Sequence, residues 1–523
     1  MSLHSIEEDT NKKRRSVFVL FQWIMSFVVS VLFLLLYSNT TSPFTNYYGE
    51  DSAFYAMVGA GMKHGLLPYR DFYEMKGPYM FWIQYLGQLI SEDRFGTFCI
   101  QTVNMTLTIG IILLIVNLAL KDCKMSACKR FLIHFSSVVF SLFMISLTFE
   151  GGNLTEEFSY PVLVLCLYLC LRYFDEQKKQ IKSDHSLIFG FIYGMAFGYF
   201  AFIRIINAAF LGAVLLTITI YLISKKNWKN ILQNAIVFIS GTIVCMLPAC
   251  IWAFIQGIFN DMIQEVYILA FSYSTELDTL ERVLLLKNFI WPMIMISIIP
   301  ILILLIFLKR DWKLWFLSAS SAIILFIAVS MGDGYLHYFS LQLPNVVLSV
   351  YIFITCCKED NSKEKWKKIL KYSLSVIAIC ICILLQKQNI QNKTIYIAKE
   401  SIKSVLNGNP QEFDVAYINE IMDYIPDNEK NRIYLYGFGS CSQWYAKAGI
   451  FPPNRYCDWQ PHWIILYPEI GLELQKTIAS KELIWIVLPA GQNVWPDEIN
   501  DAIFANYYEY YSNEFYSLFH CNE

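Results

Sequence analysis

Residues 48–86 read YGEDSAFYAMVGAGMKHGLLPYRDFYEMKGPYMFWIQYL and set charged residues beside apolar helical faces. Apolar side chains recur at about helical spacing over residues 54–66, which predicts a short helix with Asp51 at or near its N-cap. Gly and Pro then enforce a turn over residues 65–71, and a second amphipathic run covers residues 72–90. The stretch therefore predicts two short helices that lie on a bilayer surface.

The composition of the whole chain is that of a membrane protein. Of its 523 residues, 56% are hydrophobic and only 16% are charged, which is too apolar for an ordinary soluble domain. We therefore expect an α-helical polytopic membrane protein with about eleven transmembrane helices and with amphipathic juxtamembrane helices in its first outer loop. Nucleic acid is not expected as a partner.

The expected spans follow the apolar runs of the sequence. A helix that crosses the hydrocarbon layer needs about 20 apolar residues, and the stretch 187–223 is too long for one such helix, so we divide it around Arg204. The spans are expected at residues 16–37, 98–120, 131–147, 159–171, two within 187–223, 231–255, 289–308, 314–331, 339–355 and 369–385.

The charges of the loops predict the orientation of the chain in the membrane. Lys12-Lys13-Arg14-Arg15 precedes the first span, and short loops rich in Lys and Arg stay in the cytoplasm. We therefore expect a cytoplasmic N-terminal tail over residues 1–15 and an extracytoplasmic C-terminal region, in what we interpret as a bacterial cell membrane.

Three regions are predicted from these patterns. Residues 16–385 form a membrane domain, with a first outer loop at 38–97 and a second, amphipathic outer loop at 256–288 that we interpret as a mobile lid. Residues 386–523 have the composition of a small soluble domain, which we expect to be an extracytoplasmic α/β domain. Its buried strands are predicted at 433–436 and 483–488, and its helices at 413–424 and 499–507.

Two adjacent acids, Glu50 and Asp51, follow the first span. One interpretation is a helix cap beside a solvated acid. The other is a carboxylate that accepts a proton from an attacking hydroxyl or amine at the bilayer surface.

A dense charged cluster lies before the second amphipathic run and includes Arg70, Asp71, Glu74 and Lys76. It is either a surface salt-bridge network or a binding site for a phosphate or diphosphate group, which the guanidinium fork of Arg suits.

Three further sites are expected on the same side of the membrane. Glu156 and Glu157 are either helix-start acids or a second carboxylate for transfer chemistry or a divalent cation. Arg204 is a cation in an apolar stretch, which usually marks a function or a buried partner. His337 and Tyr338 either donate to a phosphate or sugar hydroxyl or belong to an interfacial belt. Such a collection of groups suits a substrate with a phosphate headgroup and a lipid tail.

These motifs resemble those of the glycosyltransferase C superfamily, which includes protein O-mannosyltransferases and lipid A aminoarabinose transferases. The resemblance covers roughly residues 15–385 and is most specific in the first outer loop. The matching segments are Asp51-Ser-Ala-Phe-Tyr55, Gly65-Leu-Leu-Pro-Tyr69-Arg70-Asp71, Lys76-Gly77-Pro78, the acids Glu156 or Glu157, Gly198 through Arg204 to Ala208, and His337-Tyr338 with Pro344.

The resemblance implies an inverting transfer of a sugar from a polyprenyl-phosphate-linked donor to a cell-envelope glycan, lipid or protein. Asp51 would be the base, and Lys76, Arg204 and His337 would hold the carrier phosphate. Many members carry the two acids in the order D-E, whereas this chain has Glu50-Asp51, so both acids remain candidates. We assign no residue to a metal and no certain cofactor, although a divalent cation stays open. The alternative is a transporter, flippase or binding protein for a lipid-linked glycan.

Overall fold

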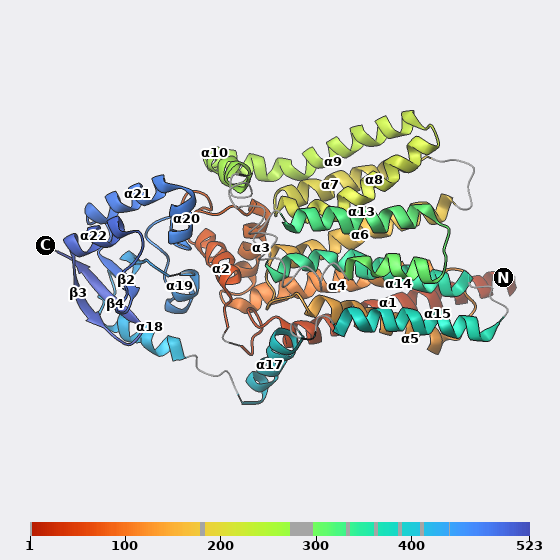
Figure 1. The fold of residues 1–523 in the computed structure, drawn as a ribbon, viewed down its shortest axis with the longest axis horizontal. Coiled ribbons are helices and arrows are strands. Elements are labelled where there is room, and N and C mark those ends of the chain that lie inside the picture. Colours follow the sequence, from red (N-terminus) through yellow and green to blue (C-terminus); the bar gives the residue numbers. More distant parts are fainter. Residues whose placement is uncertain are drawn as a thin grey trace. The chain divides into compact units, whose positions relative to one another are not determined.

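The computed structural model describes residues 3–45, 47–177, 184–271, 296–330, 335–359, 364–384, 387, 390–407, 413–438 and 440–522 (Figure 1). The chain divides into two compact units. The first, here called the helical unit, comprises Met1–Ser38, Cys99–Pro248 and Asp278–Ile402. The second, here called the mixed unit, comprises Asn39–Phe98, Ala249–Leu277 and Lys403–Glu523. The predicted first outer loop and the C-terminal region therefore belong to the same unit.

Helices make up the described part of the helical unit, and some of them continue at one end into the mixed unit. They are α1 (Leu3–Tyr37), α4 (Arg94–Ala119), α5 (Ala127–Ser146), α6 (Thr155–Gln177), α7 (Leu187–Ala201), α8 (Ala209–Ser224), α9 (Trp228–Ile255), α13 (Trp312–Ser330), α14 (Leu343–Glu359), α15 (Lys365–Leu384) and α17 (Ile395–Asn407), with the short turns η1 (Ile205–Ala208), η3 (Leu336–Gln342) and η4 (Ile390–Thr394). Within this unit α14 packs on α5 and α6, and α13 packs on α8.

Eight helical stretches among the described residues are long and apolar enough to cross a membrane. Two more apolar helices, α7 and Ile296–Ile306, are shorter. The chain is thus a multi-pass membrane protein of helical architecture, as predicted. The expected span at 289–308 lies partly outside the described residues, and the total of eleven spans stays a prediction.

The apolar stretch 187–223 is divided at the predicted place. Helix α7 ends at Ala201, Arg204 adopts an extended backbone (φ −169°, ψ 118°), and α8 begins at Ala209 after the turn η1. Small residues let α7 approach α9 closely, because a Cβ added at Gly194 would clash with the carbonyl group of Phe238. The break therefore presents Arg204 at the joint of two short helices rather than inside one long helix.

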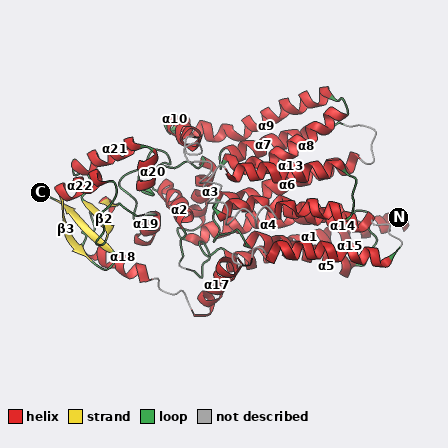
Figure 2. Cartoon of the chain, in the orientation of Figure 1, coloured by secondary structure: helices red, strands yellow, loops and turns green. Residues whose placement is uncertain are grey.

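The described strands of the chain belong to the C-terminal part of the mixed unit (Figure 2). Its elements are α2 (Glu50–Lys63), α3 (Pro78–Ile90), α10 (Phe259–Ile263), η2 (Gln264–Leu269), α18 (Phe413–Asp423), η5 (Lys430–Arg432), β1 (Ile433–Leu435), α19 (Ser442–Ala448), α20 (Gln460–Leu466), α21 (Pro468–Ala479), β2 (Trp485–Pro489), α22 (Asp497–Asn506), β3 (Tyr507–Ser512) and β4 (Tyr516–Cys521). The sheet order is β1-β2-β4-β3, with β1 parallel to β2 and the other pairs antiparallel.

The prediction of the first outer loop needs one correction. The second helix begins at Pro78 rather than at residue 72, because Tyr69 adopts a positive φ of 68° and its N–H donates to the Phe72 carbonyl, which keeps the chain in a turn. Proline is favoured at the first helical position, where its missing N–H costs nothing. At the other end, Gly49 occupies the N-cap of α2 and Asp51 lies in the first turn.

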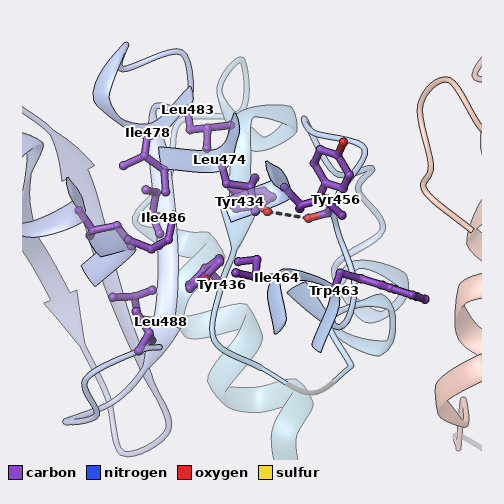
Figure 3. Packing of buried hydrophobic residues seen from close by; sticks show 14 of the residues in the cluster. Tyr434, Tyr436, Tyr456, Trp463, Ile464, Leu474, Ile478, Leu483, Ile486 and Leu488 are labelled. Carbon is purple, nitrogen blue, oxygen red and sulfur yellow. Dashed lines mark hydrogen bonds between the residues drawn. The ribbon is translucent and has the colours of Figure 1, made fainter. Parts of the chain in front are cut away.

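A buried core ties the C-terminal sheet to its helices. It includes Tyr434 of β1, Tyr436 just after β1, and Ile486 and Leu488 of β2 (Figure 3). The Tyr434 hydroxyl donates to the Tyr456 carbonyl at 2.6 Å. Tyr73, from the quoted stretch 48–86, belongs to the same core. The segment that carries the candidate base is therefore packed into the fold of the C-terminal region.

Candidate active site

The mixed unit places Asp51 in a defined environment at the start of α2. The Tyr55 hydroxyl, one helical turn later, donates to Asp51 Oδ2 at 3.0 Å. Tyr55 is buried and Asp51 is half-buried, whereas Glu50 is exposed. A carboxylate that is held and partly shielded from water is better suited to act as a base than a solvated one, so the geometry favours Asp51 over Glu50.

Lys76 lies next to the same tyrosine. Its ammonium group is 5.8 Å from the centroid of the Tyr55 ring and 3.1 Å from Glu74 Oε1. Glu74 Oε1 also accepts the backbone N–H of Met75 at 2.8 Å. Both charged side chains are largely buried, at 15% and 13% exposure, so Lys76 is a positioned cation rather than a solvated surface group.

Arg70 and Asp71 form an ion pair at the surface. Arg70 Nη2 lies 2.7 Å from Asp71 Oδ2, and the same carboxylate oxygen accepts the backbone N–H of Leu67 at 2.7 Å. The pair thus closes the turn that separates α2 from α3, and half of the Arg70 side chain is exposed.

The second outer loop contains a buried acid, Glu265, that was not among the predicted site residues. Glu265 is only 2% exposed; it pairs with Arg455 and accepts the backbone N–H of Glu74 at 3.0 Å. Burial raises the pKa of Glu265 to about 8, against the opposing effect of Arg455. The one indication in the sequence was a single Glu among the apolar residues of the predicted amphipathic loop 256–288. Residues 272–288 of the predicted lid lie outside the described residues, and the described part is anchored by this pair.

A second missed acid, Asp458, lies near the start of α2. Its carboxylate accepts the backbone N–H groups of Cys441 and Ser442 and the Ser442 hydroxyl at 3.1 Å. The same hydroxyl lies 3.4 Å from the carbonyl oxygen of Glu50. Burial raises the pKa of Asp458 to about 7, and the negative charge of Asp51 adds to that rise.

In the helical unit, Arg204 is brought together with Glu156 and Tyr338. Arg204 Nη1 lies 2.8 Å from Glu156 Oε1, and the guanidinium carbon is 4.0 Å from the centroid of the Tyr338 ring. Asn207, on the turn η1, donates to the Thr155 carbonyl at 3.1 Å. This contact fixes η1 against the start of α6, so Arg204 and Glu156 are held by their backbones as well as by their charges.

His337 also belongs to this cluster, because its ring contacts that of Tyr338. Its Nδ1 lies 2.9 Å from Glu150 Oε2, an acid that the sequence analysis missed. Glu150 opens a turn whose residues 150–153 all have positive φ, a backbone state that non-glycine residues adopt at a cost. Among the described residues, the buried His337 Nε2 has no hydrogen-bond partner.

Glu157 points away from Arg204 and is bound elsewhere in the helical unit. Its Oε2 accepts the side-chain amide of Gln101 at 2.8 Å and the backbone N–H of Asn153 at 2.7 Å. The two adjacent acids therefore differ in role: Glu156 pairs with a cation, whereas Glu157 ties α6 to α4 and to the turn before it. Among the described residues, no group of three or more His, Cys, Asp or Glu side chains is arranged to hold a metal ion.

The candidate residues thus form two clusters, one within each unit. One contains Glu150, Glu156, Arg204, His337 and Tyr338; the other contains Glu50, Asp51, Tyr55, Glu74 and Lys76. Each cation has an acid partner and an aromatic neighbour, which is an arrangement that orients a charge without neutralising it completely.

The fold is similar to that of solved membrane-protein structures. No protein-family model matches the chain, and no curated protein matches it by sequence. Two solved structures of ArnT from Cupriavidus metallidurans are similar to it. The one bound to undecaprenyl phosphate has a TM-score of 0.54 at 12% identity, and the apo form has 0.53 at 11%; each comparison covers 95% of this chain and 97% of that one. A structure of the Archaeoglobus fulgidus oligosaccharyltransferase has a TM-score of 0.43 at 12% identity and covers 89% of this chain and 68% of its own. The chain therefore shares its fold, over nearly its whole length, with the two ArnT structures.

Proposed function

We propose that this protein is a membrane glycosyltransferase that moves a sugar from a polyprenyl-phosphate-linked donor to a cell-envelope glycan, lipid or protein acceptor at the outer membrane face. The observation that carries the proposal is the likeness to ArnT over 95% of the chain, in a form that holds undecaprenyl phosphate. The ordered carboxylates and cations of the two clusters support it, because they are the groups that such a transfer requires.

Asp51 is proposed as the base. It takes the proton of the acceptor hydroxyl while the acceptor oxygen attacks the anomeric carbon, and the bond from that carbon to the carrier phosphate breaks. The electron pair leaves with the phosphate, and a single displacement inverts the anomeric centre. The hydrogen bond from Tyr55 keeps the carboxylate oriented, which is the part of catalysis that preorganisation supplies.

Lys76, Arg204 and His337 are proposed to bind the phosphate group of the carrier. Each has its own acid, namely Glu74, Glu156 and Glu150. Each acid holds its partner side chain in one orientation within its own unit, so that side chain needs little rearrangement to donate to a phosphate. The charge that grows on the leaving phosphate then increases each attraction in the transition state.

The proposal includes the orientation and the regions predicted from the sequence. The N-terminal tail is cytoplasmic, the eleven spans lie within residues 16–385, and residues 386–523 are extracytoplasmic. Accessibility of single introduced cysteines to a membrane-impermeant maleimide in intact cells tests this orientation. Labelling near residue 427 and protection near residue 122 would agree with it, and the reverse pattern would overturn it.

Sugar release in nanodiscs tests the activity. Purified wild-type protein and Asp51→Asn are incubated with radiolabelled polyprenyl-phosphate sugars and with cell-envelope extract as the acceptor. Asp427→Asn is the matched control, because this acid of the mixed unit has a side chain that is 95% exposed. Transfer that is lost only in Asp51→Asn supports the proposal. Donors that bind without being consumed would contradict it and would favour a transporter, flippase or binding protein for a lipid-linked glycan.

A further inference from the structure

The C-terminal region contributes a buried acid to the neighbourhood of the proposed base. Helix α19 packs against α2 within the mixed unit, and Ser442 at its start is fully buried. The Ser442 hydroxyl lies within hydrogen-bond distance of both the Asp458 carboxylate and the carbonyl oxygen of Glu50. The Ser442 side chain therefore lies between Asp458 and the residue that precedes Asp51, and its single proton is shared between these two acceptors.

The contacts of Asp458 hold its carboxylate in place. Two backbone N–H groups and one hydroxyl point at it, and such donors stabilise the charged form of a carboxylate. Asp458 is only 8% exposed, so little water screens its charge from a neighbour. An acid that is buried, held by donors and close to a second acid is a means of adjusting the proton affinity of that second acid.

We infer that Asp458 is a positioning residue, supplied by the C-terminal region, whose negative charge makes the neighbouring Asp51 a stronger base. This inference rests on the proposed function and deepens it, since it gives the C-terminal region a part in the transfer. The charged form of Asp458 favours a proton on Asp51 and so strengthens its attraction for the proton of the acceptor.

The other titratable groups nearby do not supply the same effect. On α2, Glu50 is exposed and the Tyr55 hydroxyl donates to Asp51. On the following loop, Lys76 is paired with Glu74. In the C-terminal region, burial raises the pKa values of the Cys441 and Cys457 thiols well above the usual range for a thiol, so both stay neutral.

The pH dependence of the pair follows from this arrangement. Asp458 has a pKa of about 7, so its charge is present above that pH and is lost below it. Transfer by the wild type is expected to rise through about pH 7 as Asp458 ionises. In Asp458→Asn this rise should disappear, because the amide carries no charge at any pH.

A reporter thiol at position 51 tests the electrostatic effect without any transfer activity. The full-length Asp51→Cys protein is alkylated with iodoacetamide across a pH series, and the labelled peptide is quantified by mass spectrometry. An ordinary thiol titrates near pH 8.5, where Asp458 is charged. Replacing Asp458 with Asn should therefore lower the alkylation midpoint by about 0.5 to 1 pH unit, while Asp458→Glu should keep the starting midpoint.

Two further variants complete the test. Asp427→Asn removes one exposed acid of the same unit and should leave the midpoint unchanged. Asp458→Ser replaces Asp458→Asn if the latter does not yield folded protein, and the same decrease is expected. A midpoint that does not respond to loss of the Asp458 charge would overturn the inference. Absence of transfer by the wild type, with a normal thiol response, would instead count against the proposed function alone.

Discussion

A single carboxylate oxygen of Glu150 binds His337 at two points. Glu150 Oε2 accepts the His337 backbone N–H at 3.1 Å and lies 2.9 Å from the ring Nδ1. An ionised carboxylate can only accept, so Nδ1 carries the proton and donates it to Glu150. The ring is thereby fixed in one orientation, with Nε2 left to face a ligand.

Loss of this acid should reduce transfer more than it reduces stability. In Glu150→Gln the amide oxygen can still accept from Nδ1, but the hydrogen bond is no longer strengthened by the charge of the carboxylate. In Glu150→Ala both effects are lost. We expect kcat/KM for the donor to fall about tenfold or more in the Ala variant, with a smaller decrease in the Gln variant.

The matched control for this pair of variants is Glu176→Gln, which removes an acid near the opposite end of α6 that pairs with Arg172. Its kinetics should equal those of the wild type. Wild-type kcat/KM in Glu150→Ala would show that His337 needs no such partner.

Breaking the Arg204–Glu156 pair should destabilise the helical unit. Glu156 is 1% exposed, and removing one partner of a buried pair costs about 3–5 kcal/mol because the other charge remains buried. Arg204→Ala should therefore lower the Tm by several degrees. The double variant Arg204→Ala with Glu156→Gln should recover much of the loss, as thermal unfolding of the purified proteins would measure.

Arg204→Lys separates the stability of this pair from donor binding. Lysine keeps a positive charge for Glu156 but lacks the planar group that stacks on Tyr338. The Tm should stay near that of the wild type, while the KM for the donor rises. Equal KM values for Arg204→Lys and the wild type would show that this guanidinium does not bind the donor.

Much of the fold could be predicted because periodicity and charge are local signals. The apolar stretch 187–223 breaks at Arg204 as expected, since a cation in an apolar run is costly unless the chain bends to place it. The strands at 433–436 and 483–488 were likewise recognisable as β1 and β2 from their continuous apolar runs. The hairpin of β3 and β4 was not predicted, because β3 is rich in Tyr and largely exposed.

The site was predicted less completely than the fold, because its acids act through distant partners. No residue near Glu150 in the sequence indicates that it contacts His337, and Glu265 pairs with Arg455 only in the folded chain. Asp458 is similar, since its donors come from residues 441 and 442. By contrast, the Asp51–Tyr55 contact follows from a spacing of four residues within one helix, and this spacing was visible in the sequence.

The close packing of α2 on α3 should depend on Gly59. A Cβ added there would lie 2.5 Å from the Gln84 Cβ and 2.7 Å from the Gln84 backbone carbon, so the two helices would have to move apart. We expect Gly59→Ala to cost about 1–3 kcal/mol, seen as a lower Tm. Gly212→Ala in α8 is the matched control, because a Cβ added there would lie 3.9 Å from its nearest neighbour, the Ile324 side chain of α13. Equal Tm values for the two variants would contradict this account of the helix packing.

The buried Glu265 should make stability depend on pH. Its pKa is raised from 4.5 to about 8 in the folded protein, so the folded state binds the proton more tightly than the unfolded state. Its contribution to stability is therefore fully present below about pH 4.5 and is lost as the pH rises to about 8.

Glu265→Gln isolates this contribution. The variant carries a neutral amide in place of the protonated acid that the wild type holds below about pH 8, so the two proteins should differ little in stability near pH 5. It also removes the titrating group, so the Tm of the wild type should fall relative to that of the variant between pH 5 and pH 8. The difference should amount to a few kcal/mol by the linkage relation. Thermal unfolding of both proteins across that range measures it, and parallel Tm curves would show that Glu265 keeps its ordinary proton affinity in the folded chain.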